Sequence, residues 1–129
     1  MRHDIFVYLS GPMQANASGL TIQQNLATAI AIHHQLLQAG VPNYCPHVSG
    51  LAPSAWTALT PAQWLAFDEV VIDRCTHLLM LPHWQLSIGA RHEWRYAVTK
   101  RMPIAHSVRD LYWLLTGADA EEQGDGQGI

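Results

Sequence analysis

Charged residues and cysteines are scarce in this 129-residue sequence: 13% of the residues are charged, and two are cysteines, Cys45 and Cys75. The seven Lys and Arg residues form no run, which argues against binding to a nucleic-acid polymer. The cysteines have neither metal nor redox spacing, which predicts free thiols in a reducing compartment. The sequence has no signal-peptide pattern after Met1 and no apolar run near the ~20 residues of a membrane span, so we expect a cytoplasmic protein that does not contact membranes.

Apolar residues, at 49%, are abundant enough for one compact domain. From position 117 onward the sequence instead mixes glycines with four of its ten acidic residues. We therefore predict one domain over residues 1–116 and an acidic, Gly-rich, disordered tail over 117–129. The eight histidines include no pair at the spacing of a zinc-binding helix, and the sequence has neither a dinucleotide nor a phosphate-loop glycine motif. We expect no metal and no cofactor.

Segments typical of buried strands alternate along the chain with segments of helical period. The predicted strands are 4–10, 41–44, 77–81 and 102–106. The predicted helices are 21–39, 61–75 with Thr60 as N-cap, 87–100 and 108–116. Residues 45–60 have no period and are predicted to form a functional loop. The alternation predicts an α/β fold, Rossmann-like (flavodoxin-like), with a mainly parallel sheet of four to five strands and helices on both faces.

Ligands of such sheets bind beyond the carboxyl ends of the strands, which directs attention to the loops after Ser10, Tyr44 and Leu81. Beside them, Asp68 falls in the middle of an apolar helical stripe, whereas Glu69 and Asp73 fall on the opposite, solvent side. The stripe consists of Trp64, Leu65, Phe67, Val71, Ile72 and Cys75. An ionised carboxylate facing a core is costly unless it is paired or borders a cavity. Asp68 is therefore either a buried cap of a neighbouring loop or an acid at the rim of a pocket.

Glu93 is the second acid of interest, because it lies one turn into a helix that directly follows a predicted strand. Ser87 can cap this helix, and the free N–H groups of its first turn favour an anion. Gly89 shares a face with Glu93, so a ligand can approach the backbone there, and Ala90 and Ala97 flank that face. The alternative is an ordinary solvent-facing helix acid.

Together, these segments resemble the nucleoside 2-deoxyribosyltransferase superfamily, in particular its short bacterial and phage members. The resemblance covers most of residues 4–106. It is carried by Tyr8-Leu9-Ser10-Gly11-Pro12-Met13, by Asp68, and by the stretch Leu79 to Glu93 with its Ser87-Ile88-Gly89-Ala90 segment. It implies an enzyme that cleaves an N-glycosidic bond, by hydrolysis or by transfer, through a covalent glycosyl-glutamate intermediate.

The resemblance also implies residue roles. Glu93 is the nucleophile, Tyr8 positions and polarises it, and Asp68 handles protons at the leaving base or contacts the sugar. Ser87 matches a phosphate-holding serine of the related 2'-deoxynucleoside 5'-phosphate N-hydrolases, which favours a nucleoside 5'-monophosphate over a deoxynucleoside. The remaining substrate-binding candidates are Ser10, Gly11, Pro12, Met13, His47, Trp84, Gly89 and Ala90, of which Trp84 either stacks on a base or covers the core.

A homodimer or higher homo-oligomer is expected from the same resemblance, since isolated sites in this superfamily are typically incomplete. Ser107 is a candidate for the residue that a neighbouring subunit donates. Two other functions stay open: a catalytically silent nucleotide-binding sensor, and a glutamate-dependent NAD glycohydrolase.

Overall fold

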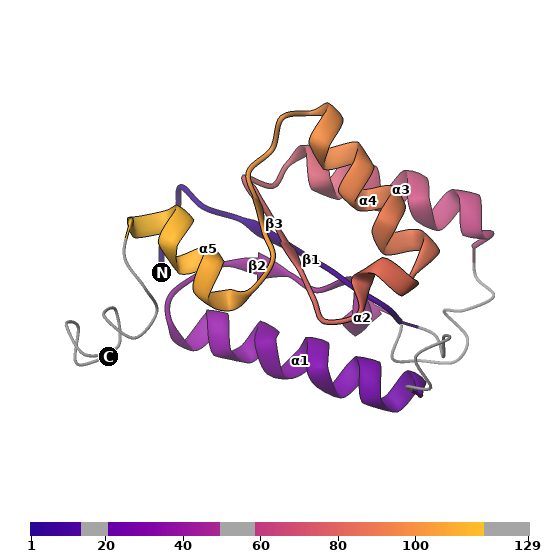
Figure 1. The fold of residues 1–129 in the computed structure, drawn as a ribbon, viewed down its shortest axis with the longest axis horizontal. Coiled ribbons are helices and arrows are strands. Elements are labelled where there is room, and N and C mark those ends of the chain that lie inside the picture. The colour runs from indigo at the N-terminus through magenta and orange to yellow at the C-terminus, as the bar shows by residue number, and fades with distance from the viewer. Residues whose placement is uncertain (14–20, 50–58, 118–129) are drawn as a thin grey trace.

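The computed structural model describes residues 1–13, 21–49 and 59–117 (Figure 1). Four strands alternate with helices along the chain, as the sequence predicts. The strands are β1 (Val7–Ser10), β2 (Asn43–Tyr44), β3 (His77–Met80) and β4 (Ile104–Ala105). The helices are α1 (Ile22–Gln38), α2 (Pro46–Ser49), α3 (Pro61–Asp73), the 3-10 turn η2 (Trp84–Leu86), α4 (Ile88–Thr99) and α5 (Val108–Thr116).

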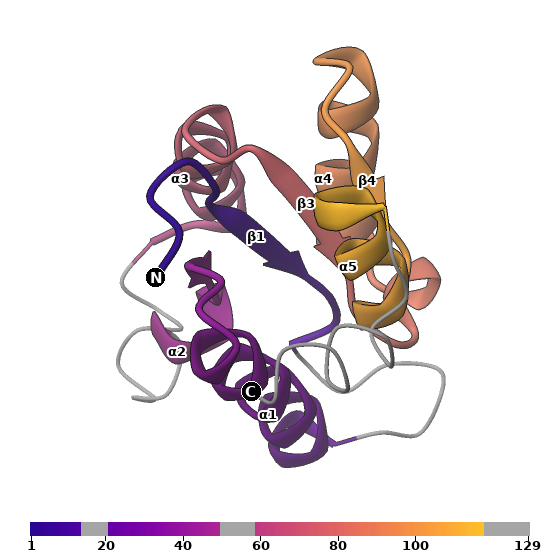
Figure 2. The same ribbon diagram turned by 90° about the vertical axis from the view of Figure 1, so that its left-hand side faces the viewer.

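The strands form one sheet in the order β2-β1-β3-β4, and every neighbouring pair is parallel. The predicted Rossmann-like α/β fold is therefore confirmed. Helices α3 and α4 cover one face of the sheet, and α1 and α5 lie on the other, as Figures 1 and 2 show from two directions. The chain moves outward from β1 to β2 and then returns past β1 to β3. The loops after β1 and β3 thus diverge at the point where the strand order reverses.

The core has two layers because side chains along a strand alternate between the faces of the sheet. Val7 and Leu9 of β1 pack toward α1 and α5, whereas Tyr8 packs toward α3 and α4. In β3, Leu79 belongs to the first layer, and Leu78 and Met80 belong to the second. This alternation determines which side chains of β1 can meet α4.

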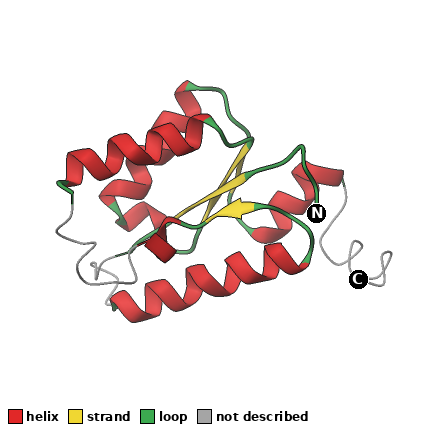
Figure 3. Cartoon of the chain, turned by 180° about the vertical axis from the view of Figure 1, so that it is seen from behind, coloured by secondary structure: helices red, strands yellow, loops and turns green. Residues whose placement is uncertain are grey.

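Local sequence signals account for the helix boundaries. Thr21 and Thr60 each cap a helix, and each forms a capping box with the glutamine three residues later. Gly40, which directly follows the predicted end of the first helix, has the left-handed φ of 78° that favours glycine. The predicted structureless loop after Tyr44 is wrong at its start, where α2 forms; four residues are too few to produce a helical period (Figure 3).

The predicted apolar stripe of α3 is wrong in part. Phe67, a member of the stripe, is 44% exposed, and within α3 only Ile72 is buried. Asp68 and Glu69 are both half-buried, although Glu69 was predicted to face solvent. The reason is that α3 packs beside α4 as well as on the sheet, so one side of it contacts a polar helix face.

No helix in the three described stretches has both the length and the apolar character needed to cross a bilayer. Of the predicted tail, the structure describes Gly117, which ends α5 with a left-handed φ of 75°. The rest of the tail, and the part of the predicted loop at 50–58, lie outside the described residues.

Candidate active site

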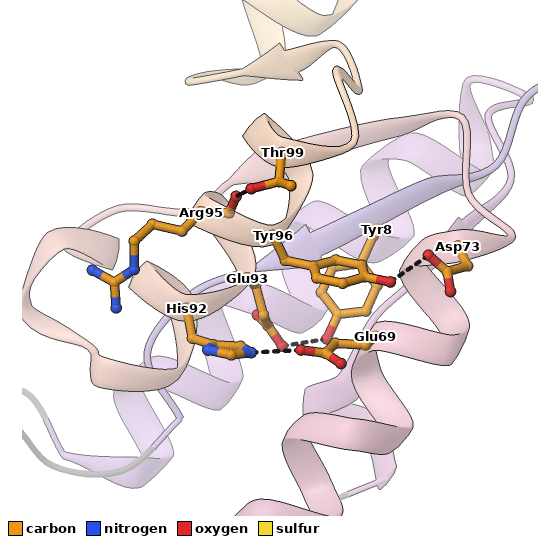
Figure 4. Close-up of polar contacts among 8 residues, drawn as sticks. All are labelled: Tyr8, Glu69, Asp73, His92, Glu93, Arg95, Tyr96 and Thr99. Atoms are coloured by element: carbon orange, nitrogen blue, oxygen red, sulfur yellow. Dashed lines mark hydrogen bonds and ion pairs between the residues drawn. The ribbon is translucent and has the colours of Figure 1, made fainter.

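Glu93 is buried in the structure, with 6% of its surface exposed. Each oxygen of its carboxyl group accepts a short hydrogen bond from β1. The Tyr8 hydroxyl donates to Oε2 at 2.6 Å, and the Ser10 hydroxyl donates to Oε1 at 2.7 Å. Figure 4 shows the Tyr8 contact. Since Tyr8 and Ser10 are two residues apart on one strand, they present both hydroxyls on the same face of the sheet.

Glu93 reaches the sheet because α4 lies close to it. The buried residues of α4 are Ala90, Glu93 and Ala97, whose spacing of three and four places them on one face of the helix. The two alanines have small side chains and let the helix axis approach the strands, while Glu93 extends between them to β1. The interpretation of Glu93 as a solvent-facing acid therefore does not describe its position.

Asp68 joins the same cluster from α3. Its side chain is half-buried and lies close enough to Glu93 and Tyr8 for the three groups to shift one another's pKa values. Three elements, β1, α3 and α4, thus bring Tyr8, Asp68 and Glu93 together, although they are far apart in the sequence. We call these three residues and Ser10 the carboxyl cluster.

The carboxyl cluster holds its protons tightly. Burial first, and then the neighbouring Asp68 carboxyl, raise the pKa of Glu93 to about 8 against the lowering effect of the two hydroxyl donors. Burial also raises the pKa of Asp68. The pKa of Tyr8 lies well above its usual value because of burial and then the charges of Glu93 and Asp68. Near neutral pH the two carboxyl groups consequently retain a shared proton, and Tyr8 remains a donor.

Two effects act on the place of the shared proton. The deeper burial of Glu93 favours a proton on Glu93. The two hydroxyl donors favour one on Asp68, because both oxygens of Glu93 accept hydrogen bonds and such donors stabilise a carboxylate over a carboxylic acid. The cluster therefore contains a carboxylate, which can act as a nucleophile or base, beside a carboxylic acid, which can donate a proton.

The carboxyl cluster lies where β1 ends, next to the end of β3, at the reversal of strand order. Gly11 directly follows Ser10. It has to be a glycine because Leu81, another part of the same protein, lies very close to its Cα. A Cβ at Gly11 would lie 2.6 Å from Leu81 Cβ. The Leu81 amide also donates to the Ser10 carbonyl. Gly11 thus allows the loops after β1 and β3 to pack against each other. This packing alone accounts for a glycine at position 11.

His47 is 1% exposed, and its ring lies between two parts of the chain. Its Nε2 lies 2.9 Å from the Pro12 carbonyl, and its Nδ1 lies 3.8 Å from Cys45 Sγ. Burial lowers the pKa of His47, so its ring is neutral and Nε2 is the donor to Pro12. Met13 is tied in turn to α1 through its carbonyl, 3.5 Å from the Asn25 side-chain amide. In this structure His47 and Pro12 shape the loop after β1.

The predicted anion site at the start of α4 has the expected local form. Ser87 caps the helix by accepting a hydrogen bond from the Ala90 amide at 3.2 Å. A methyl group at Gly89 would meet only Ser87 Oγ, at 4.0 Å, so space is open beside this turn. Trp84 stacks on Trp94, with ring centroids 5.8 Å apart, and therefore covers the core at its inner face. Ser107 caps α5, away from the carboxyl cluster.

Sequence reasoning missed a second set of contacts between α3 and α4, shown in Figure 4. Glu69 Oε2 lies 2.7 Å from His92 Nε2, and the Tyr96 hydroxyl donates to Asp73 Oδ1 at 2.6 Å. Lys100 Nζ lies 2.8 Å from the same Asp73 oxygen. A signal was present in the four-residue spacing of acidic residues on one helix and of their partners on the other, but pairing them needs the register of the helices.

Two hollows lie elsewhere on the molecule. One of about 260 Å³ lies at the C-terminal ends of α3 and α4 and is lined by Asp73, Cys75, Thr76, Lys100 and Met102. The other, of about 190 Å³, lies between α1 and the start of α5 and includes Ser107. Neither lining includes a member of the carboxyl cluster. Among the residues that the structure describes, no three His, Cys, Asp or Glu side chains gather as metal ligands.

Fold and site together define an α/β protein with a buried carboxyl group, Glu93, and a half-buried one, Asp68, at the reversal of its strand order. The chain belongs to the family described as a domain of unknown function (DUF4406), whose model matches residues 5–106, more than half of the sequence. The match begins just before β1 and ends just after β4, so it contains every strand and the whole carboxyl cluster. Comparison with curated proteins and with solved structures gave no match.

Proposed function

We propose that this protein cleaves the N-glycosidic bond of a nucleoside 5'-monophosphate or a deoxynucleoside, by hydrolysis or transfer, through a covalent glycosyl-glutamate intermediate. The observation that carries the proposal is the buried Glu93 carboxyl, whose two oxygens accept hydroxyl hydrogen bonds while a second acid, Asp68, lies beside it. Glycosidic cleavage passes through an oxocarbenium-like state, and enzymes commonly meet it with two carboxyl groups in different protonation states.

In the first step, a Glu93 carboxylate oxygen forms a bond to the anomeric carbon as the bond from that carbon to the base nitrogen breaks. The electron pair of the broken bond goes to the base, and the proton on Asp68 goes with it. Tyr8 and Ser10 hold the carboxylate in one orientation throughout. A carboxylic acid of raised pKa beside an oriented carboxylate suits this division of work.

In the second step, water attacks the anomeric carbon and the bond to Glu93 breaks, which regenerates the carboxylate. The Asp68 carboxylate accepts the proton that the water loses. If a second base replaces water, its nitrogen forms the new glycosidic bond and the reaction is a transfer. Asp68 then takes the proton from that base, and the protein returns to its starting state in either case.

The start of α4 supports a substrate with an anionic group. The amides of its first turn carry a partial positive charge and lie one turn from Glu93. Ser87 occupies one of these amides and offers a hydroxyl, while the space beside Gly89 is open. A 5'-phosphate at this turn would place the sugar between the helix start and Glu93. This reasoning favours the monophosphate over the free nucleoside.

The test is incubation of the protein with a panel of ribo- and deoxyribonucleosides, their 5'-monophosphates and NAD, with free base followed by chromatography. We expect base release from a monophosphate or deoxynucleoside, and none from a Glu93→Ala variant. Denaturing mass spectrometry of a stalled reaction should find the glycosyl group on Glu93. Asp110→Ala, which removes an acidic side chain of α5 on the other face of the sheet, is the control and should keep full activity.

Other outcomes would assign other functions. Tight binding of one nucleotide with no base released from any would replace the enzyme by a nucleotide sensor. Release of nicotinamide from NAD alone would make the protein a glutamate-dependent NAD glycohydrolase. Full turnover by Glu93→Ala would remove the proposed mechanism altogether.

We also infer a homo-oligomer. Phe67 and Val70 of α3 are 44% and 48% exposed, and Trp113 of α5 is 55% exposed. Large apolar side chains of this exposure are enriched at protein interfaces. The solution mass of the protein, measured by light scattering, tests this inference, and an active monomer would contradict it.

A further inference from the structure

A second polar pair lies directly outside the carboxyl cluster. Glu69 follows Asp68 on α3, and His92 precedes Glu93 on α4, so the same two helical turns supply both pairs. Glu69 Oε2 and His92 Nε2 are 2.7 Å apart, and their side chains are 32% and 37% exposed (Figure 4). Asp68 and Glu93, whose carboxyl groups are electrostatically coupled, are therefore the inner pair of these turns, and Glu69 and His92 form the outer contact.

The outer contacts repeat along the two helices. One turn further on, Asp73 accepts a hydrogen bond from Tyr96 at 2.6 Å and lies 2.8 Å from Lys100 Nζ. Residue numbers rise together on both helices from one contact to the next, so α3 and α4 run parallel in register. Of all these contacts, Glu69–His92 is the one level with the carboxyl cluster.

The inner pair needs such support. Two carboxyl groups attract each other only while they share a proton, and they repel once both are ionised. The sheet gives little help on the α3 side, because Ile72, a full turn beyond Asp68, is the only buried residue of α3. The position of Asp68 relative to Glu93 thus depends on what joins the helices at that turn.

We propose that Glu69 and His92 are positioning residues, whose contact holds Asp68 and Glu93 at proton-sharing distance. An effect of this contact on catalysis rests on the proposed function. Its effect on the titration of the two carboxyls does not, because it is measured in the ligand-free protein. Tyr8 and Ser10 from β1 donate to the Glu93 carboxyl, and the contact between Glu69 of α3 and His92 of α4 lies next to the pair along both helices. Tyr44 of β2 stacks behind Tyr8 at a centroid distance of 5.8 Å.

The test compares Glu69→Ala with Glu69→Gln. Both variants remove the same negative charge, but the glutamine keeps an acceptor for the His92 N–H and the alanine does not. Carbon-13 NMR of the Asp and Glu side-chain carboxyls in the ligand-free protein reports the titration of the pair directly. We expect Glu69→Ala to lower the upper pKa of the pair by about 0.5–1 unit relative to Glu69→Gln, because separated carboxyls no longer share a proton.

His92→Ala removes the same contact from the other helix. Its loss should lower the upper pKa of the pair, as in Glu69→Ala. Asp73→Ala is the matched control, because it removes the outer contacts one turn away. It should leave the titration of Asp68 and Glu93 unchanged. Thermal melting should show a similar loss of stability in Glu69→Ala and Asp73→Ala.

The proposal is overturned if Glu69→Ala and Glu69→Gln titrate alike, or if Asp73→Ala shifts the pair as much as Glu69→Ala does. Where base release is measured, we expect kcat of Glu69→Ala to fall about 10- to 100-fold, with KM changed less than kcat. If no substrate of the panel releases base while the titrations still differ as expected, the glycosidase assignment fails and the positioning role of Glu69 and His92 stands.

Discussion

The Tyr8 hydroxyl donates a 2.6 Å hydrogen bond to Glu93 Oε2 across 85 positions of sequence, in the buried layer between the sheet and α4. A donor this short to a carboxyl oxygen orients the group and favours its charged form. The contact joins the end of β1 to the helix that follows β3. The orientation and the protonation of Glu93 therefore depend on β1.

Tyr8→Phe tests that dependence. We expect kcat for base release to fall about 100-fold, because one of the two donors to the nucleophile is lost and Ser10 remains. The pKa of the carboxyl pair should rise, which moves the onset of activity to higher pH. Tyr112→Phe, a half-buried tyrosine on the α5 side, is the control and should leave both the rate and the pH profile unchanged. An unchanged profile in Tyr8→Phe would refute the role of this hydrogen bond.

Glu93→Gln should abolish activity and stabilise the fold. A carboxyl whose pKa is raised by folding binds its proton more tightly in the folded state, so its contribution to stability is lost as pH rises from about 4.5 toward 8. The amide carries no charge to desolvate and keeps polar atoms for Tyr8 and Ser10. We expect a gain of about 1–3 kcal/mol at pH 8 and little gain at pH 5, measured by urea unfolding. Equal effects at both pH values would contradict the raised pKa.

The sequence predicted the inner side of this site better than the outer side. Tyr8 and Ser10 share a face by the two-residue period of a strand, and Ala90, Glu93 and Ala97 share one by helical spacing, so each pattern is local. The register between α3 and α4 could not be predicted from the sequence. Glu69 and His92 are 23 positions apart, and their contact follows from how two helices pack on one sheet.

One error and one contact that the sequence did not predict have a similar origin. Phe67 was placed in a core stripe because a helical wheel counts apolar residues without knowing what lies beside the helix, and it is 44% exposed. Gly11 is predicted to contact substrate, and the space that its missing side chain leaves is filled by Leu81, so the fold itself requires the glycine. In both cases the local pattern is real, but its partner is chosen by tertiary packing.

Two glycines at the site provide a matched pair of substitutions. Gly89→Ala places a methyl group in open space within a helix, so the fold should gain about 0.5–1 kcal/mol. If the first turn of α4 binds the substrate, KM should nevertheless rise about tenfold, because the methyl group occupies that space. Gly11→Ala should instead lose about 1–3 kcal/mol, since its Cβ would lie 2.6 Å from Leu81 Cβ.

Thermal melting and steady-state kinetics on the two glycine variants check these expectations. A stable Gly89→Ala protein with unchanged KM would exclude the start of α4 from substrate binding. A Gly11→Ala protein as stable as the original would show that the loops after β1 and β3 can move apart without cost.

His47 should give stability the opposite dependence on pH from the carboxyl pair. Burial lowers its folded pKa below the ordinary value of 6.5, so the unfolded chain binds more protons than the folded one as pH falls below 6.5. The stability that neutral His47 contributes is therefore lost as pH falls below 6.5, whereas the stability that the carboxyl pair contributes increases as pH falls. His47→Gln keeps a donor for the Pro12 carbonyl and removes the titration. Unfolding free energies measured from pH 5 to 8 should fall less steeply toward acid in this variant, and an identical pH dependence would mean that His47 is not buried as a neutral ring.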